Sequence, residues 1–214
     1  MNDDPFEEHL NNPKSIKETL VEPIGLCLLE PSSLVTFLQT AIKECLGQEA
    51  NEISCNILSW LVHSLRLLCL ALVQSTSPEN SSNVDSIRAS RAQALIETIC
   101  LILNLKQPIQ DYSAANSTKL PECTVERLNY AYIKAIESVA KSFLSRCLPY
   151  DTQDELTKYI AEKLALQSRD LLLTTLIEMA LCSLRGAKSG LIKKCALKIL
   201  VHLTVTKPYV PPET

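Results

Sequence analysis

Apolar residues recur at helical spacing along most of this chain, and only 4 of its 214 residues are glycine. Leucine, isoleucine and alanine supply most of these apolar positions, a composition that favours helices over short strands joined by tight turns. Alternation with a period of two, which marks a half-buried strand, never persists for more than a few residues. We therefore predict an all-α protein of seven or eight helices, packed mostly as antiparallel helical hairpins because most connections are short.

The helical patterns indicate one domain with a polar segment at each end. Residues 1–14 are polar and acidic, and we expect a flexible N-terminal lead-in there. Residues 15–206 are expected to form a single all-helical domain, since the loops predicted at 76–86 and 107–123 are too poor in glycine and proline to separate domains. Residues 207–214 form a proline-rich tail.

Caps and apolar spacing give the expected helix bounds. A short helix is expected to begin at Ser15. The longer helices are expected at 32–47, 52–75, 85–106, 124–148, 153–166, 169–185 and 190–206. Leu34 and Ile87 fall on predicted inward faces, and Trp60 is assigned to the core because it lies among aliphatic residues.

The segment from Glu52 to Ser75 is the most apolar in the chain and nearly long enough to span a bilayer. His63 and Arg66 lie in its middle, where charge is costly in lipid, and no positive cluster marks either end. We interpret it as a central helix covered by its neighbours, so that no membrane span is expected. Membrane association through residues 53–75 is kept as an alternative.

The nine cysteines indicate a reducing compartment. Their number is odd, no two lie close together, and most stand among aliphatic residues, which favours free, buried thiols over a disulfide framework. The acidic N-terminus lacks the basic and then apolar run of a signal peptide. We therefore expect an intracellular protein, cytoplasmic or nuclear.

No motif for catalysis or metal binding occurs in the sequence. The three histidines, His9, His63 and His202, are far apart, and there is no CxxC, HExxH or G-x-S-x-G sequence. Four glycines cannot supply a glycine-rich phosphate loop. We expect no metal, no cofactor and no enzymatic activity.

Residues 170–205 read as two apolar helices joined by a short turn through Gly186. In the second helix Ile192, Lys193 and Ala196 supply an aliphatic, a basic and a small residue at the spacing of a HEAT or armadillo-type helical repeat, which this segment resembles. Lys193 stands where arginine is more usual, and the turn lacks the acidic residue that often pairs with it. The resemblance implies a short solenoid; an irregular helical bundle is the alternative.

The distribution of charge suggests where a partner binds. The net charge is −3, yet the stretch from Arg185 to Lys207 holds six basic residues and no acidic one. We predict a non-catalytic scaffold or adaptor, alone or within a larger complex, that mediates protein–protein interactions and presents a basic face to an acidic protein partner. The predicted binding residues are Lys188, Lys193, Lys194 and Lys198. Nucleic-acid association through the same helix is an alternative, although no aromatic residues interleave with these lysines to stack on single-stranded bases.

Overall fold

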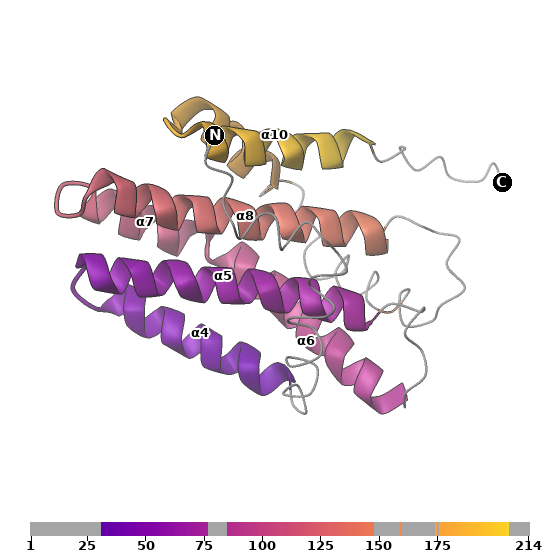
Figure 1. Ribbon diagram of the computed structural model, residues 1–214. Helices are drawn as coiled ribbons and strands as arrows, with labels where there is room; N and C mark the ends of the chain where they lie inside the picture. The colour runs from indigo at the N-terminus through magenta and orange to yellow at the C-terminus, as the bar shows by residue number, and fades with distance from the viewer. Residues whose placement is uncertain (1–30, 77–84, 148–158, 160–173, 175, 206–214) are drawn as a thin grey trace.

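The computed structural model describes residues 31–76, 85–147, 159, 174 and 176–205, and within these ranges helices are the only regular elements (Figure 1). The labelled helices are α4 (Pro31–Gly47), α5 (Glu52–Ser75), α6 (Asp85–Asn104), α7 (Lys106–Asn116), α8 (Glu122–Cys147) and α10 (Gly190–Val205). Residues 176–186 are helical as well. The all-α prediction is therefore confirmed for this part of the chain. The predicted lead-in, the tail, the helix at Ser15 and the helix at 153–166 lie outside the described residues, apart from the single position 159.

Helix α5 begins at Glu52, the start expected from the apolar segment, and Asn51 caps its first turn. The side chain of Asn51 accepts a hydrogen bond from the Ser54 backbone N–H at 2.8 Å, and the Ser54 hydroxyl accepts one from the Asn51 backbone N–H at 3.0 Å. Two backbone donors that the helix cannot satisfy are thus satisfied locally. A cap of this kind stabilises a helix by about 1 kcal/mol.

The loop predicted at 107–123 is wrong over most of its length, because α7 occupies Lys106–Asn116. Pro108 falls in the first turn of α7, where a missing backbone N–H leaves no intrahelical bond unmade. Ile109 and Tyr112 are buried, three residues apart on one face. The polar residues around them occupy the solvent side, and they gave the segment the composition of a loop.

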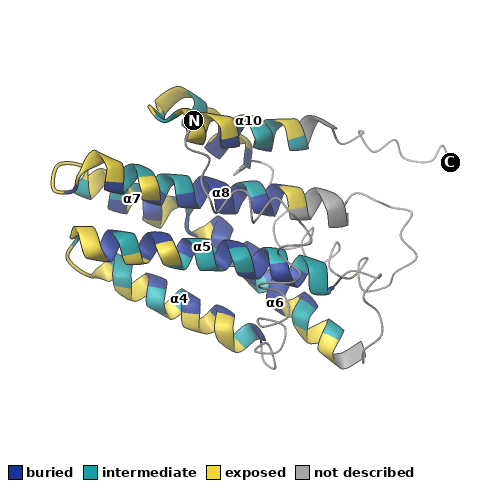
Figure 2. Ribbon diagram, in the orientation of Figure 1, coloured by how far each residue is buried: buried dark blue, intermediate teal, exposed yellow. Residues whose placement is uncertain are grey.

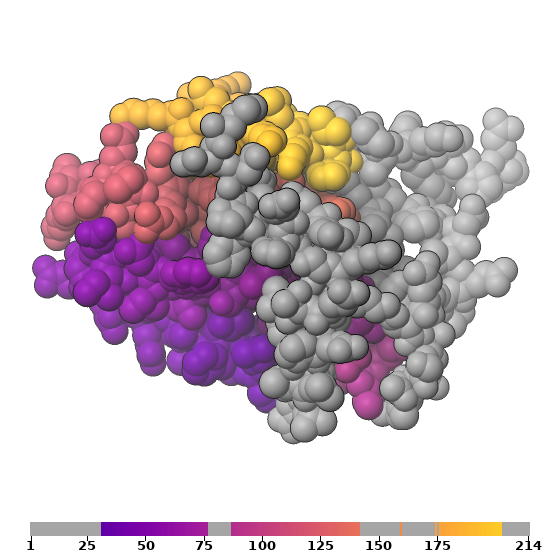
Figure 3. All heavy atoms as spheres, in the orientation of Figure 1, coloured from indigo at the N-terminus to yellow at the C-terminus, as the bar shows by residue number. Residues whose placement is uncertain are grey.

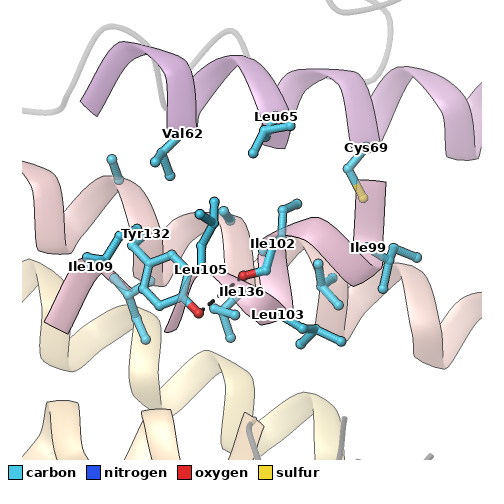
Figure 4. Packing of buried hydrophobic residues seen from close by; sticks show 14 of the residues in the cluster. Val62, Leu65, Cys69, Ile99, Ile102, Leu103, Leu105, Ile109, Tyr132 and Ile136 are labelled. Carbon is cyan, nitrogen blue, oxygen red and sulfur yellow. Dashed lines mark hydrogen bonds between the residues drawn. The ribbon is translucent and has the colours of Figure 1, made fainter. Parts of the chain in front are cut away.

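The helices form layers (Figure 1), with α5 packed against α4, α6 and α8, and α10 on the side of α8 away from α5. The core between them is aliphatic, and Figure 4 shows Val62 and Leu65 of α5 opposite residues of α6 and α8. Tyr132 brings a polar atom into this core, where its hydroxyl donates to the Ile102 carbonyl at 3.2 Å. Burial raises the pKa of Tyr132 well above its usual value, so the phenol is neutral and a donor.

Three residues assigned to the core from the sequence are instead exposed. Trp60 is 60% exposed and lies with Ile53 and Ile57 along one side of α5, the side that α4, α6 and α8 leave uncovered. Leu34 of α4 and Ile87 of α6 are also exposed. In each case the helical period was right, but spacing alone does not say which side of a helix its neighbours cover.

By length and composition, α5 is the one helix among the described residues that could cross a membrane, and half of its most apolar window is buried inside the protein. Its Arg66 is buried and donates through Nε to the Ser138 hydroxyl at 3.1 Å. Core helices of soluble proteins pass the same test of length and hydropathy. Membrane association through residues 53–75 stays an alternative prediction.

The seven cysteines whose side chains are described are all free thiols. Cys55, Cys69 and Cys195 are buried, Cys45 and Cys100 are half-buried, and the remaining two are exposed, contrary to the expectation of general burial. Burial raises the pKa of Cys195 to about 11, so little of its reactive thiolate exists at neutral pH.

Native alkylation should therefore separate the thiols into two groups. We expect iodoacetamide at pH 8 to modify Cys123 and Cys182 within minutes, and Cys55, Cys69 and Cys195 only after urea is added, as read by peptide mass spectrometry. Rapid native labelling of Cys195 would show that the inner face of α10 does not pack on α8 as described.

Replacement of Ala196 by leucine tests the seam beneath α10. Ala196 is fully buried, so three added carbons have to displace neighbouring atoms, and we expect a loss of roughly 1–3 kcal/mol in the free energy of unfolding. Urea denaturation measures this loss, with Leu197→Ala as the control because Leu197 is exposed. A neutral Ala196→Leu would mean that the seam holds spare volume.

Candidate binding site

A shallow hollow of about 660 Å³ lies on the outer side of α10, where that helix meets α8. We call it the basic hollow. Its described lining residues come from these two helices: Glu137 and Lys141 of α8, and Gly190, Lys193, Lys194, Leu197, Lys198, Val201 and His202 of α10. Four lysines thus surround one carboxylate.

The residues of α10 reach the basic hollow because the opposite side of the helix is buried. Ile192, Cys195, Ala196 and Ile199 recur at helical spacing, form the inner face, and belong to the hydrophobic core. Lys194, Leu197 and Val201 follow the same period on the outer face and are exposed. Figure 2 shows α10 divided in this way, and Figure 3 places α10 on the molecular surface.

Three of the four lysines predicted as binding residues line the basic hollow, namely Lys193, Lys194 and Lys198. Lys188 does not. It precedes α10 and forms an ion pair with Glu122, at the first residue of α8, over 2.5 Å. The hydrogen bond and the charge of Glu122 raise the pKa of Lys188. Lys188 lines a different hollow, between α7, α8 and residues 176–186.

Several residues of the basic hollow were not predicted from the sequence. Lys141 and Glu137 belong to α8. The sequence of α8 does not indicate which helix packs beside these charged residues. Lys134, Glu137 and Lys141 are spaced at i, i+3 and i+7, which places them along one side of a helix. That spacing could have predicted that the three charged residues lie on one side of α8. The packing of α10 on α8 was needed to show that this side borders the basic hollow.

Glu137 links the basic hollow to a buried cation. Its carboxylate lies 3.3 Å from Lys134 Nζ and 3.8 Å from Lys198 Nζ. The side chain of Lys134 is only 2% exposed, so its ammonium depends on nearby oxygens in place of water. Lys198 is partly exposed at the edge of the hollow. Glu137 therefore serves two cations, one inside the protein and one at the site.

The polar contacts continue from Lys134 across α8 to α5. The Ser138 hydroxyl donates to the Lys134 backbone carbonyl at 3.1 Å and accepts from Arg66 Nε at 3.1 Å. All three residues are buried. Hydrogen bonds and ion pairs thus connect α5, α8 and α10 through a region that is otherwise aliphatic.

The second hollow, about 630 Å³, is lined by mixed polar and apolar residues of α7, α8 and residues 176–186. Contacts within the protein join the two sides of this region: Lys106 of α7 forms an ion pair with Glu178, and Gln110 Nε2 donates to Met179 Sδ at 3.8 Å. Its charged lining residues are Glu122, Glu126 and Lys188, and Lys188 pairs with Glu122, so it shows no cluster of like charges comparable to the four lysines of the basic hollow. Within the described ranges, no three His, Cys, Asp or Glu side chains gather as a metal site would require.

Glu137→Gln tests the dual role of this carboxylate. Removing its charge leaves the buried Lys134 without its nearest described counter-charge, and we expect a loss of roughly 3 kcal/mol in the free energy of unfolding. Urea denaturation checks this, with Glu44→Gln as a matched control on the exposed side of α4. Equal stability of the two variants would show that other oxygens suffice for Lys134.

The chain matches no family model, no curated protein and no solved structure. What the basic hollow can bind follows from its own residues: four lysines, one engaged carboxylate and two exposed aliphatic side chains.

Proposed function

We propose that this protein is a non-catalytic helical scaffold that binds an acidic protein partner at the basic hollow. The observation that carries the proposal is the surplus of positive charge there. Four lysines from two helices face one carboxylate, and that carboxylate already interacts with the buried Lys134. The surplus stands on a chain whose formal net charge is −3, so it is a local feature and not a property of the whole surface.

A positive hollow attracts carboxylates in two ways. It raises the rate of encounter with an acidic surface, and it favours such a surface over neutral or basic ones. Lys141, Lys193 and Lys194 are exposed, so salt in solution screens their fields and binding should fall as ionic strength rises. Because α10 packs on α8, the backbone positions that carry the lysines are set before the partner arrives, which lowers the entropy cost of binding.

The HEAT-like arrangement is part of the same proposal. Residues 176–186 and α10 are helical, only residues 187–189 join them, and the small residue Ala196 is fully buried. These features support a HEAT-like hairpin within a short solenoid, with an irregular helical bundle as the alternative. The free state of all seven described cysteines supports the proposal of an intracellular location.

A charge-reversed protein tests the binding proposal. The variant Lys141→Glu with Lys194→Glu changes two exposed residues of the basic hollow, and Lys43→Glu with Lys119→Glu changes two exposed lysines elsewhere. We expect a fluorescent glutamate-rich peptide of 20 residues to bind the parent protein and the control pair, with an affinity that falls between 50 and 200 mM salt. Binding to the hollow variant should be at least tenfold weaker, and both variants should keep the parent melting temperature.

The same assay separates the alternatives. Tighter binding of single-stranded RNA than of the peptide would favour nucleic-acid association, and salt-resistant binding to phosphatidylcholine vesicles would favour membrane association through residues 53–75. Equal weakening by the control pair would mean that the basic hollow is not the site.

A further inference from the structure

The basic hollow is not uniformly polar, and its apolar part carries information about the partner. Leu197 and Val201 line it and are 53% and 54% exposed. They are four residues apart on α10, so they lie one turn apart on the same side of the helix. Lysines flank this pair: Lys193 and Lys194 on the preceding turn, Lys198 beside it, and Lys141 across from it on α8.

From this arrangement, and resting on the proposed function, we infer that the acidic partner is an amphipathic helix. Its aliphatic residues pack on Leu197 and Val201, and its Asp and Glu residues flank that seam and meet the lysines. A polyanion with no apolar groups would leave the two aliphatic side chains in water and gain nothing from them. Phosphate backbones are therefore a poorer match than a helix that alternates apolar and acidic positions.

The backbone around the hollow also selects a helix over an extended peptide. A strand binds by pairing with a free sheet edge, and the described residues form only helices, whose backbone groups bond within themselves. Proline-rich segments need grooves lined with aromatic residues, and among the described lining residues of the basic hollow His202 is the one aromatic side chain. Side chains spaced one helical turn apart pack best against a second helix with the same spacing.

The lysines should not contribute equally to the partner's affinity. Lys198 lies 3.8 Å from Glu137, so a partner carboxylate has to share it with a carboxylate of the protein. Lys141, Lys193 and Lys194 are exposed, and no ion pair of the described residues engages them. We expect these three to carry most of the electrostatic recognition, and Lys198→Ala to weaken binding less than Lys194→Ala.

A selection from displayed peptides tests the inference without assuming the partner's sequence. Random 20-residue peptides are selected on the full-length protein and counter-selected on the Lys141→Glu with Lys194→Glu variant. We expect the enriched peptides to carry aliphatic residues at i, i+3 or i+4, and i+7, with Asp or Glu beside them, and to gain helical circular dichroism on binding. Leu197→Ser and Val201→Ser should each weaken the best peptide about tenfold.

Leu191→Ser is the matched control. Leu191 also lies on α10 and is exposed, but it does not line the basic hollow, so its loss should change affinity by less than twofold. Enrichment of acidic peptides without aliphatic periodicity, or an empty selection while the glutamate-rich peptide still binds, would overturn the helix inference and leave the proposed function standing. Peptides that bind the parent and the charge-reversed variant equally would overturn both.

Discussion

The middle of α8 is buried nearly all the way round, and the rest of the molecule depends on this constraint. Every residue from Ala131 to Ala140 is buried except the half-buried Glu137, because α5 packs on one side of α8 and α10 on the other. A helix in this position can carry polar side chains only if each finds a partner inside the protein. Ser138 and Lys134 do so, through Arg66 of α5 and through Glu137. Small residues at 131, 135 and 140 leave room for the neighbouring helices to approach.

This constraint joins the buried core to the basic hollow at one residue. Glu137 neutralises Lys134 within the protein and also contacts Lys198 at the rim of the basic hollow. A hydrophobic residue in place of Lys134 would need no such arrangement, and replacing buried ion pairs by apolar residues is often neutral or stabilising. The pair costs desolvation, but it fixes the position of the carboxylate on which the charge pattern of the hollow is centred. The four lysines therefore share the hollow with a carboxylate whose position is set from inside the core.

Sequence reasoning predicted well those features that depend on neighbours along the chain. The all-α class, the start of α5 at Glu52 and the inner face of α10 are of this kind. It was wrong for α7, because polar residues and Pro108 gave a buried-face helix the composition of a loop. The assignment of Trp60 to the core was wrong, because helical spacing shows which residues share a face of the helix but not whether another helix covers that face. The separation of Lys188 from the other three lysines depends on Glu122, which is 66 residues away in sequence.

Two exposed apolar surfaces of the protein illustrate how much a structure can say about a partner. Ile53, Ile57 and Trp60 form one on α5, and these described side chains alone do not specify the chemistry of what would cover it. Leu197 and Val201 form the other. There the lysines of two helices indicate that the partner is negatively charged and where its charges lie relative to the apolar contact. Apolar area supplies affinity but little selectivity, whereas charges placed around it exclude most competing surfaces. The basic hollow is informative because its apolar and charged residues occur on the same turns of α10. The burial of Cys195, Ala196 and Ile199 on the opposite face of the helix fixes which side of α10 presents them.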